Sequence, residues 1–507
     1  MNIAAHLMRA GRAFAGWPAI AKGSSVLLPY GALYDRVNRL AHALRHRHAL
    51  HQGDRVALAL GNCPAYLEIL YACWHAGLIA VPINAKLHPA EFAYILDNSG
   101  ARLCFTSAAL TGSIAGLAAG EPRDVVQVDS EDYDRMLASE PLRLVDCAPD
   151  DPAWLFYTSG TTGRPKGAVL SHRNLLAMSL CYFADVDQQA PWRTILHAAP
   201  MSHGSGLYAL AHVMQASCHV IPESGGFDVA EIYSLIGAWP DVVFFAAPTM
   251  IRRLLDHPRD ADTGKLKTIL YGGGPMYVED LLAGIARLGP KFAQLYGQGE
   301  SPMTITALSS RVIADRTHPR WRDRIASVGI AQSAVEVHTI DEAGAELPAG
   351  EIGEVVVRGE TVMSGYWNNP AATADTLRDG WLHTGDLGCF DAEGFLTLKD
   401  RSKDLIISGG SNIYPREVEE ALIQHAGIAE VSVVGRPDRE WGEAVVAYIV
   451  PQAATRLDTA GLDQFCADRI ARFKRPRYYR IVAALPKNSN GKVLKKDLRD
   501  MELNRAE

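Results

Sequence analysis

Several features that mark common protein classes are missing from this 507-residue sequence. The eight cysteines form no Cys-x-x-Cys pair, so neither a zinc site nor a disulfide framework is indicated. The most hydrophobic helical run, residues 66–78, contains Glu68 and His75 and is too short to span a bilayer. The N-terminal residues lack a clean signal-peptide core. We therefore expect a cytoplasmic protein with no integral membrane segment.

Positive charge is not in excess either. The net charge is −7, which gives the chain as a whole no electrostatic case for a nucleic-acid partner. Apolar residues make up 48% and charged residues 21%, which is ordinary for a soluble globular enzyme. A chain of this length exceeds one ordinary hydrophobic core, and it shows no internal repeat, so two or more domains are expected.

Helical and strand patterns alternate over the first half of the chain. A buried strand at 56–60 precedes a helix at 66–76 and a second strand at 79–83. This β-α-β order favours an α/β fold with a parallel sheet flanked by helices. Four further short strands follow the same pattern, at 195–199, 218–221, 242–246 and 268–271.

The pattern changes from about residue 335. The segments 335–340 and 354–358 alternate as strands of an antiparallel sheet do. A dense charge cluster follows at 399–404, and the remainder indicates a small α+β unit with helices at 416–424 and 462–470. We place a domain boundary inside the cluster, which predicts domains 1–402 and 403–507.

The most informative segment runs from Tyr157 to Gly167 and reads Tyr-Thr-Ser-Gly-Thr-Thr-Gly-Arg-Pro-Lys-Gly. It follows a short apolar strand, and its glycines, hydroxyls and single lysine are suited to wrapping a polyphosphate. It is not a Walker A loop, because Pro165 precedes Lys166 and Gly167 follows it. The simpler alternative is a glycine-rich surface turn with no ligand.

This segment resembles the signature loop of the adenylate-forming superfamily, which includes acyl-CoA synthetases, peptide-synthetase adenylation domains and beetle luciferases. The resemblance implies a large N-terminal domain of several sheets with flanking helices and a small, mobile α+β C-terminal domain. It also implies an ATP-binding loop made of Thr158, Ser159, Gly160, Thr161, Thr162, Gly163 and Lys166.

Two further segments resemble the nucleotide site of this superfamily. In Leu-Tyr-Gly-Gln-Gly-Glu, residues 295–300, the resemblance puts Tyr296 against adenine and Glu300 on Mg²⁺. The superfamily usually has threonine just before the glutamate, whereas this chain has Gly299, so the hydroxyl that would help to hold the carboxylate or the α-phosphate is absent. The triple glycine that contains Gly272 and Gly273 resembles the lining of the adenine slot and the acyl tunnel.

The C-terminal half supplies the remaining charged groups. A carboxylate in a Gly-Asp turn can accept both ribose hydroxyls, and Asp386 is our candidate. Arg401 matches the arginine aimed at ribose and phosphate, although a surface ion pair with a neighbouring aspartate is the simpler alternative. The resemblance makes Lys492 the catalytic lysine of the first half-reaction, and it places Lys403 at the hinge about which the small domain rotates.

Two features favour coenzyme A as the acceptor. The segment 408–419 resembles the strand edge that lines the pantetheine channel of acyl-CoA synthetases. Residues 469–499 hold eleven Lys and Arg against one acid, which suits a polyanionic ligand, although a solvated basic face is the alternative. The candidate CoA-binding residues are Gly409, Gly410, Trp441, Phe473 and Lys474.

The acyl pocket is expected to be apolar. His203 matches a residue that often gates the pocket, and its alternative is an ordinary core histidine. Amino-acid-activating relatives carry an aspartate in this region, and malonate-activating relatives tend to carry arginine where this chain has Leu295. We therefore expect a fatty acid or an aryl carboxylate. The candidate pocket residues are His203, Phe245, Gly272, Gly297 and Met303.

Together these motifs predict an ATP-dependent, AMP-forming acyl-CoA ligase. Its partners would be a small carboxylic acid, ATP with Mg²⁺, and CoA, and the enzyme could act as a homodimer. One alternative is an adenylating enzyme that loads a carrier-protein thiol. The other is a non-catalytic nucleotide-binding homologue, which the full set of candidate residues argues against.

Overall fold

The computed structural model describes residues 1–117, 124–158, 164–187, 193–258, 262–274, 276–409, 411–453, 455–488 and 491–504. Tertiary contacts divide the chain into two compact units. The first unit comprises Met1–Pro275, Ala283–Val337 and Val357–Leu382; the second comprises Met276–Leu282, His338–Val356 and His383–Glu507. These clusters do not test the expected boundary after residue 402, which stays a prediction.

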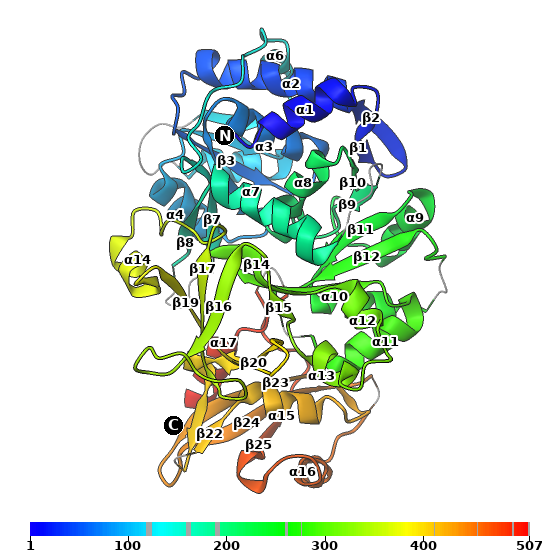
Figure 1. Cartoon of the computed structure of the whole chain (residues 1–507), viewed down its shortest axis with the longest axis vertical. Coiled ribbons are helices and arrows are strands. Elements are labelled where there is room, and N and C mark those ends of the chain that lie inside the picture. Colours follow the sequence, from blue (N-terminus) through cyan, green and yellow to red (C-terminus); the bar gives the residue numbers. More distant parts are fainter. Residues whose placement is uncertain are drawn as a thin grey trace. The chain divides into compact units, whose positions relative to one another are not determined.

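Within the described residues, nine strands form the largest sheet, in the order β15-β14-β13-β12-β11-β9-β10-β1-β2 (Figure 1). Its central strands run parallel, and antiparallel hairpins close both edges. The strands are β1 (Pro18–Lys22), β2 (Ser25–Pro29), β9 (Thr194–Leu196), β10 (Cys218–Ile221), β11 (Val242–Ala246), β12 (Leu266–Tyr271), β13 (Phe292–Gln298), β14 (Ser301–Leu308) and β15 (Ile330–Ala331).

A second sheet, of six strands in the described chain, has the order β6-β5-β3-β4-β7-β8. Strands β3 to β6 pair in parallel, as the β-α-β pattern predicted, whereas β7 and β8 form an antiparallel hairpin. The strands are β3 (Arg55–Leu60), β4 (Ile79–Asn84), β5 (Leu103–Thr106), β6 (Asp124–Gln127), β7 (Pro152–Thr158) and β8 (Lys166–Ser171).

The two remaining sheets contain the later strands. One has the order β16-β17-β19-β18, with β20 paired to β19, and the other has the order β22-β21-β24-β23, with β25 paired to β24. Their strands are β16 (Val335–Ile340), β17 (Gly353–Gly359), β18 (Leu377–Arg378), β19 (Trp381–Phe390), β20 (Leu396–Arg401), β21 (Ile406–Ser408), β22 (Ser411–Ile413), β23 (Ile428–Asp438), β24 (Gly442–Pro451) and β25 (Tyr478–Ile481).

The α-helices of the described chain cover these sheets or join their strands. None of them is long and apolar enough to cross a membrane. They are α1 (Ala5–Ala13), α2 (Tyr30–His42), α3 (Pro64–His75), α4 (Pro89–Ser99), α5 (Ala108–Ala115), α6 (Glu131–Leu137), α7 (His172–Cys181), α8 (Gly204–Met214), α9 (Val229–Ala238), α10 (Pro248–Leu255), α11 (Val278–Leu288), α12 (Ser310–Ala314), α13 (Trp321–Ala326), α14 (Pro370–Thr376), α15 (Pro415–Leu422), α16 (Thr459–Ala467) and α17 (Lys495–Leu503).

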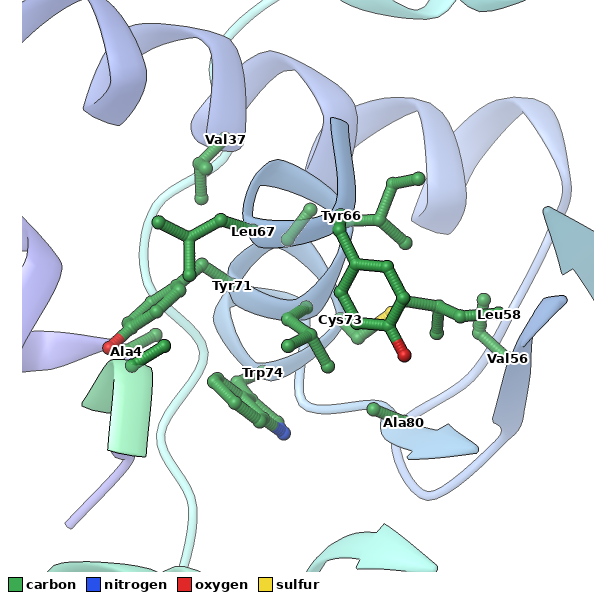
Figure 2. Close-up of a cluster of buried hydrophobic side chains, with 14 of the residues drawn as sticks. Ala4, Val37, Val56, Leu58, Tyr66, Leu67, Tyr71, Cys73, Trp74 and Ala80 are labelled. Carbon is green, nitrogen blue, oxygen red and sulfur yellow. The ribbon is translucent and has the colours of Figure 1, made fainter. Parts of the chain in front are cut away.

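Helix α3 is the centre of the largest core. Its residues from Ala65 to His75 are all buried, which explains why its sequence is mostly apolar on every face. The buried Glu68 is paired with Arg36. Figure 2 shows the aromatic side chains of α3 among Val56 and Leu58 of β3 and Ala80 of β4. The core places the ends of β3, β4 and β7, and so positions the loop after β7.

The predicted elements agree with the structure where periodicity and length were both clear. The strands at 218–221, 242–246 and 335–340 match β10, β11 and β16. The helix expected at 462–470 begins three residues earlier as α16, because the Asp458 side chain accepts hydrogen bonds from the amides of Ala460 and Gly461 and caps it there. The strand expected at 195–199 ends at Leu196, where the chain leaves the sheet.

Three histidines are fully buried around α8, β9 and β10. His197 Nδ1 lies 2.8 Å from Ser205 Oγ, and His197 Nε2 lies 3.1 Å from His219 Nδ1. His212 contacts the Tyr182 hydroxyl at 3.2 Å. Burial lowers the pKa of His197 and of His212 to about 3, with the charge of Arg193 adding to the effect at His212.

Acidification is therefore expected to destabilise this part of the protein. His197 and His212 stay neutral in the folded chain, whereas in the unfolded chain they take up protons with a pKa of about 6.5. Below that pH the unfolded state binds more protons, so the free energy of unfolding falls as the pH drops from about 6.5 toward about 3. Between neutral pH and about pH 5, each histidine should account for a loss of about 2 kcal/mol.

Urea unfolding at the two pH values measures this loss. The variant His212→Gln should lose less stability on acidification than the unmodified protein. His51→Gln is the matched control, because the His51 side chain is 80% exposed. If both variants lose the same stability on acidification, the loss does not come from the buried imidazole rings.

Candidate functional site

The candidate phosphate loop joins the two strands of an antiparallel hairpin. Thr158, the last residue of β7, pairs in register with Lys166, the first residue of β8. The two residues therefore flank the loop from opposite sides. Five predicted loop residues lie outside the described residues: Ser159, Gly160, Thr161, Thr162 and Gly163.

Lys166 and Glu300 meet at one tyrosine side chain. The Lys166 ammonium lies 5.0 Å from the centre of the Tyr366 ring, within the range of a cation–π contact. The Tyr366 hydroxyl donates a hydrogen bond of 2.6 Å to Glu300 Oε1. The structure thus brings together a cation and a carboxylate that are more than a hundred residues apart in the sequence.

Tyr366 itself was missed by the sequence analysis. Its segment lies against β8 through one isolated antiparallel bridge, between Ala168 and Tyr366, and the Trp367 amide donates to Gly167 O at 2.8 Å. The only signal in the sequence is the turn-rich run Gly-Tyr-Trp-Asn-Asn-Pro at 365–370, which shows no link to Glu300.

Glu300 occupies the tight turn between β13 and β14, where it is 9% exposed. Its carbonyl oxygen accepts a hydrogen bond of 2.8 Å from the amide of Met363. Gly299, just before it, has no room for a side chain. A Cβ there would overlap Thr158 Cγ2 and would lie 2.8 Å from Phe156 Cδ1, so side chains of β7 fill the space that the usual threonine would need.

The expected acyl-pocket residues also gather in the first unit. The His203 ring lies edge-on to Phe156, with centroids 5.3 Å apart, and burial lowers its pKa to about 4, so the imidazole is neutral. A Cβ at Gly204 would lie 3.0 Å from Met303 Cε and 3.2 Å from Phe245 Cε1. His203, Phe245 and Met303 are only partly buried, so His203 is not a fully enclosed core histidine.

The glycines of this region let neighbouring backbone segments pack closely against one another. A Cβ at Gly272 would lie 2.5 Å from Leu295 O, and one at Gly297 would lie 2.6 Å from the Met303 amide. Gly273 has φ of +77°, a conformation that side-chain-bearing residues rarely adopt. Tyr296, on β13, is 8% exposed.

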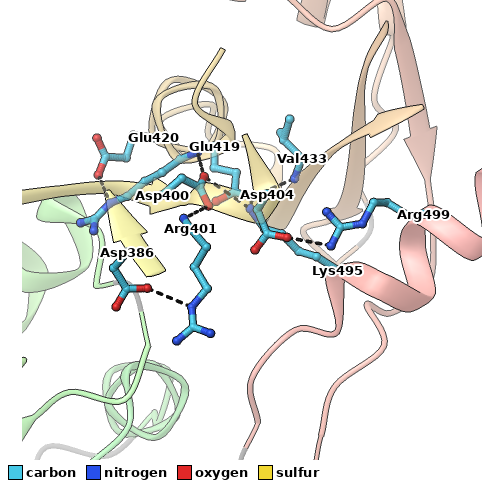
Figure 3. A network of polar contacts seen from close by, with 10 residues as sticks. Asp386, Asp400, Arg401, Asp404, Glu419, Glu420, Val433, Lys495 and Arg499 are labelled. Atoms are coloured by element: carbon cyan, nitrogen blue, oxygen red, sulfur yellow. Dashed lines mark hydrogen bonds and ion pairs between the residues drawn. The ribbon is translucent and has the colours of Figure 1, made fainter. Parts of the chain in front are cut away.

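The second unit holds the candidate ribose group. Asp386 on β19 pairs in register with Arg401 on β20, and Arg401 Nε lies 2.9 Å from Asp386 Oδ1 (Figure 3). Asp386 therefore lies within strand β19 and not in the Gly-Asp turn expected from the sequence, because it pairs with β20 there. Glu354 holds the residues just before it, accepting a hydrogen bond from the Gly385 amide at 3.0 Å and contacting His383 Nδ1 at 2.9 Å. The Arg401 guanidinium thus points at the Asp386 carboxylate, the candidate ribose group.

Lys492 stands on a turn organised by Asn488. The Asn488 side chain accepts a hydrogen bond of 2.9 Å from the Lys492 amide, and the Asn488 amide donates to Lys492 O at 2.9 Å. Partial desolvation and the positive charges of Arg401 and Lys403 lower the pKa of the exposed Lys492 ammonium. Burial and Arg401 also lower the pKa of Lys403, the candidate hinge residue.

A partly buried ion network holds this lysine segment to β20, to α15 and to Asp404 in the turn after β20. Lys495 Nζ lies 3.0 Å from Glu419 and 3.8 Å from Asp400, and Arg499 bonds Asp404 at 2.7 Å (Figure 3). Burial opposes the charge on Lys495, but Glu419 and Asp400 raise its pKa overall. The lysine that begins α17, three residues after Lys492, is therefore firmly anchored.

The candidate CoA residues fall into two pairs. Gly409, at φ +58°, lies against Trp441, whose carbonyl oxygen accepts a hydrogen bond of 2.7 Å from the Gly409 amide. Phe473 is 53% exposed, and the neighbouring Lys474 bonds Glu417 at 2.7 Å. Gly410 lies outside the described residues.

Comparisons with known proteins identify the family of the chain. The chain matches the AMP-binding enzyme family over residues 7–367 and the AMP-binding enzyme C-terminal domain over residues 417–492. It is 37% identical to the feruloyl-CoA synthase of Amycolatopsis sp over 93% of both chains. It is also 34% identical to the fatty acid–acyl-carrier-protein ligase ScoC of Streptomyces coeruleorubidus, over 93% of this chain and 91% of that one.

Among solved structures, ATP-bound MatB of Rhodopseudomonas palustris superposes with a TM-score of 0.91 at 30% identity, covering 100% of this chain and 99% of that one. The likeness confirms the expected α/β fold with a large N-terminal and a small C-terminal domain. The chain belongs to the AMP-binding enzyme family, as an acyl-CoA synthetase-type member of the adenylate-forming superfamily.

Proposed function

We propose that this chain is an ATP-dependent, AMP-forming acyl-CoA ligase. In the first half-reaction a carboxylate oxygen of the acid attacks the α-phosphorus of ATP, and pyrophosphate leaves. In the second, the thiol sulfur of CoA attacks the acyl carbon, and AMP leaves as the thioester forms. The observation that carries the proposal is the meeting of Lys166 and Glu300 at Tyr366, in the unit that also holds the expected acyl-pocket residues.

The candidate residues of the first unit would bind the phosphates of ATP and the Mg²⁺ ion. Thr158 and Lys166 would bind the phosphates of ATP, because a hydroxyl donor and a point charge flank the loop. Glu300 is suited to Mg²⁺, which favours oxygen ligands and is usually held by one or two carboxylates together with substrate phosphates. When bound, Mg²⁺ would neutralise charge that builds up on the phosphates. The Tyr366 hydroxyl would orient the Glu300 carboxylate.

In the second unit, Asp386 would accept the ribose hydroxyls, and Arg401 would orient it while facing the phosphates. Lys492 would stabilise the negative charge shared between the acid and the α-phosphate. The predicted domain boundary at 402, the hinge at Lys403 and the CoA channel at Gly409, Trp441, Phe473 and Lys474 belong to the same proposal.

For the acid, we propose an aryl carboxylate, with fatty acids as the second class. Phe156, His203, Phe245 and Met303, which gather around Gly204 and His203, would give the pocket aromatic and sulfur-containing walls. Such walls favour a flat aromatic ring, which gains from edge and face contacts beyond the area that it buries. The 37% identity to a feruloyl-CoA synthase supports the same class.

The location and assembly are further parts of the proposal. The eight cysteines remain thiols, which supports a reducing cytoplasm. A homodimer is proposed as the working assembly, and sedimentation velocity distinguishes it from a monomer.

ATP–pyrophosphate exchange across hydroxycinnamic, benzoic, fatty and short dicarboxylic acids tests the function. We expect exchange with the aryl acids that requires Mg²⁺ and is lost on chelation, together with AMP release that depends on CoA. AMP release that does not depend on CoA, together with transfer of the acyl group to a phosphopantetheinyl carrier protein, would favour the carrier-protein alternative. The identity to ScoC makes that alternative worth including. No exchange with any acid would contradict the proposal.

A further inference from the structure

The side-chain amide of Asn62 forms its hydrogen bonds with one segment that is distant in the sequence. It lies in the turn between β3 and α3. Its Nδ2 donates to the carbonyl oxygens of His197 and Ala199, each at 2.8 Å, and its Oδ1 accepts from the Met201 amide at 2.8 Å. Both donors and the acceptor of one side chain thus hold three backbone groups over five consecutive residues.

The segment that Asn62 holds leads directly to the acyl pocket. Strand β9 ends at Leu196, and α8 begins at Gly204, so residues 197–203 lie outside any helix or strand. The segment carries His203, which contacts Phe156, and it leads into Gly204, which lies against Phe245 and Met303. Its backbone geometry therefore sets where these pocket groups stand.

Met201 packs directly against the first turn of α8. A Cβ at Gly206, in the first turn of α8, would overlap the Met201 carbonyl oxygen. The Leu207 amide also donates to His203 O at 3.1 Å. Because no gap separates Met201 from this turn, a shift of the backbone at Met201 must move the start of α8 as well.

We propose that Asn62 is a positioning residue for the acyl pocket, and that the selection of the acid depends on its side-chain amide, whose hydrogen bonds within the described residues go to the segment 197–201. The proposal rests on the proposed acyl-CoA ligase function. It adds a residue that fixes the shape of the acid site without belonging to the nucleotide site.

The substitution Asn62→Asp separates the chemistry of the amide from its size. A carboxylate of the same shape still accepts from the Met201 amide, but it turns an oxygen instead of an N–H group toward two carbonyl oxygens. The segment must then move away from residue 62. A misplacement of about 1 Å far from the reacting atoms can lower a rate about a hundredfold.

The test is steady-state ATP–pyrophosphate exchange by the full-length protein with its best acid. For Asn62→Asp we expect the KM for the acid to rise by about tenfold or more, with the KM for ATP within about twofold of the unmodified protein. The preference between a long and a short aryl acid should change as well, which a merely destabilised protein would not show.

Asn2→Asp is a matched control. Asn2 makes the same pattern of contacts, since its amide donates to Trp74 O and Val145 O and its oxygen accepts from the Ala4 amide. It lies among N-terminal core residues, so its substitution should cost stability but leave the KM for the acid unchanged. If Asn62→Asp fails to fold, Asn62→Ala is measured in its place with the same expectation.

Four outcomes would overturn the inference. Asn62 has no positioning role if the folded variant keeps the acid KM and the acid preference of the unmodified protein. The role is also wrong if the KM values for acid and ATP rise together, or if Asn2→Asp gives the same kinetic change. If the unmodified protein exchanges with no acid, the proposed function fails, and this inference fails with it.

Discussion

Replacing Lys492 with alanine is expected to lower acyl-AMP formation by about a hundredfold or more, the usual cost of removing a group that stabilises charge in the transition state. The turn around Asn488 presents the ammonium, and Lys495 anchors the same segment between Glu419 and Asp400. Alanine should therefore remove the charge without displacing the turn. Thioester formation from preformed acyl-AMP should be nearly unchanged, because in the proposed mechanism the lysine acts only in the first half-reaction.

The two half-reactions are measured separately, the first by ATP–pyrophosphate exchange and the second by release of AMP from synthetic acyl-AMP and CoA. Lys496→Ala is the matched control, since it removes the same charge from an exposed position four residues away. The control should keep exchange near the level of the unmodified protein. Equal losses in both half-reactions of Lys492→Ala would show that the lysine has a general structural role instead.

The pH profile of the first half-reaction, on its alkaline side, gives an independent check on Lys492. Partial desolvation, Arg401 and Lys403 lower the pKa of this ammonium, so it should lose its proton at a lower pH than a free lysine does. The active form is the protonated one, and exchange should fall as the pH rises through that pKa. The fall should be absent in Lys492→Ala.

The sequence predicted the parts of the fold that local pattern determines. The strand at 242–246 is a continuous apolar run of strand length, the strand at 218–221 is apolar apart from His219, and the structure has β11 and β10 at the same residues. The loop from Thr158 to Lys166 was recognised from its composition, and the structure shows a hairpin that closes it. Where a side chain sets the boundary, as Asp458 does for α16, periodicity alone placed it three residues off.

Contacts between distant segments were not predictable in the same way. Tyr366 and Glu300 are 66 residues apart, and Asn62 and Met201 are 139 apart, so no spacing rule links them. The charge cluster at 399–404 was interpreted as a connector between domains. In the structure its Asp400 and Asp404 bind Lys495 and Arg499 on α17. Identical residue types can form a solvated loop or a buried network, and only the fold decides between them.

Gly299 shows how a departure from the superfamily pattern can be explained by packing. From the sequence, the missing threonine hydroxyl suggested a weakened site. The structure adds that Thr158 Cγ2 and the Phe156 ring occupy the volume beside Gly299, and that Phe156 in turn contacts His203. The glycine and the bulky side chains of β7 are thus two parts of one arrangement, and the pocket wall depends on both.

Introducing the usual threonine, Gly299→Thr, is therefore expected to reduce acyl-AMP formation by about tenfold or more. The new Cβ would overlap Thr158 and press on Phe156, and overpacking of this kind typically costs about 1–3 kcal/mol. The displaced groups are the first residue of the candidate phosphate loop and a wall of the acid pocket, so the KM values for both ATP and the acid should rise. Exchange assays and thermal unfolding of the variant measure the two effects.

A second substitution identifies the cause of that loss. Thr158→Ser keeps the hydroxyl and removes the methyl group that the new side chain would overlap, so the double variant should recover part of the lost activity. Gly16→Thr is the control for adding threonine where a Cβ meets nothing within 4 Å, and it should leave exchange unchanged. Activity of Gly299→Thr equal to or above that of the unmodified protein would mean that Phe156 and Thr158 yield easily. Activity above that of the unmodified protein would in addition show that the missing hydroxyl limits this site.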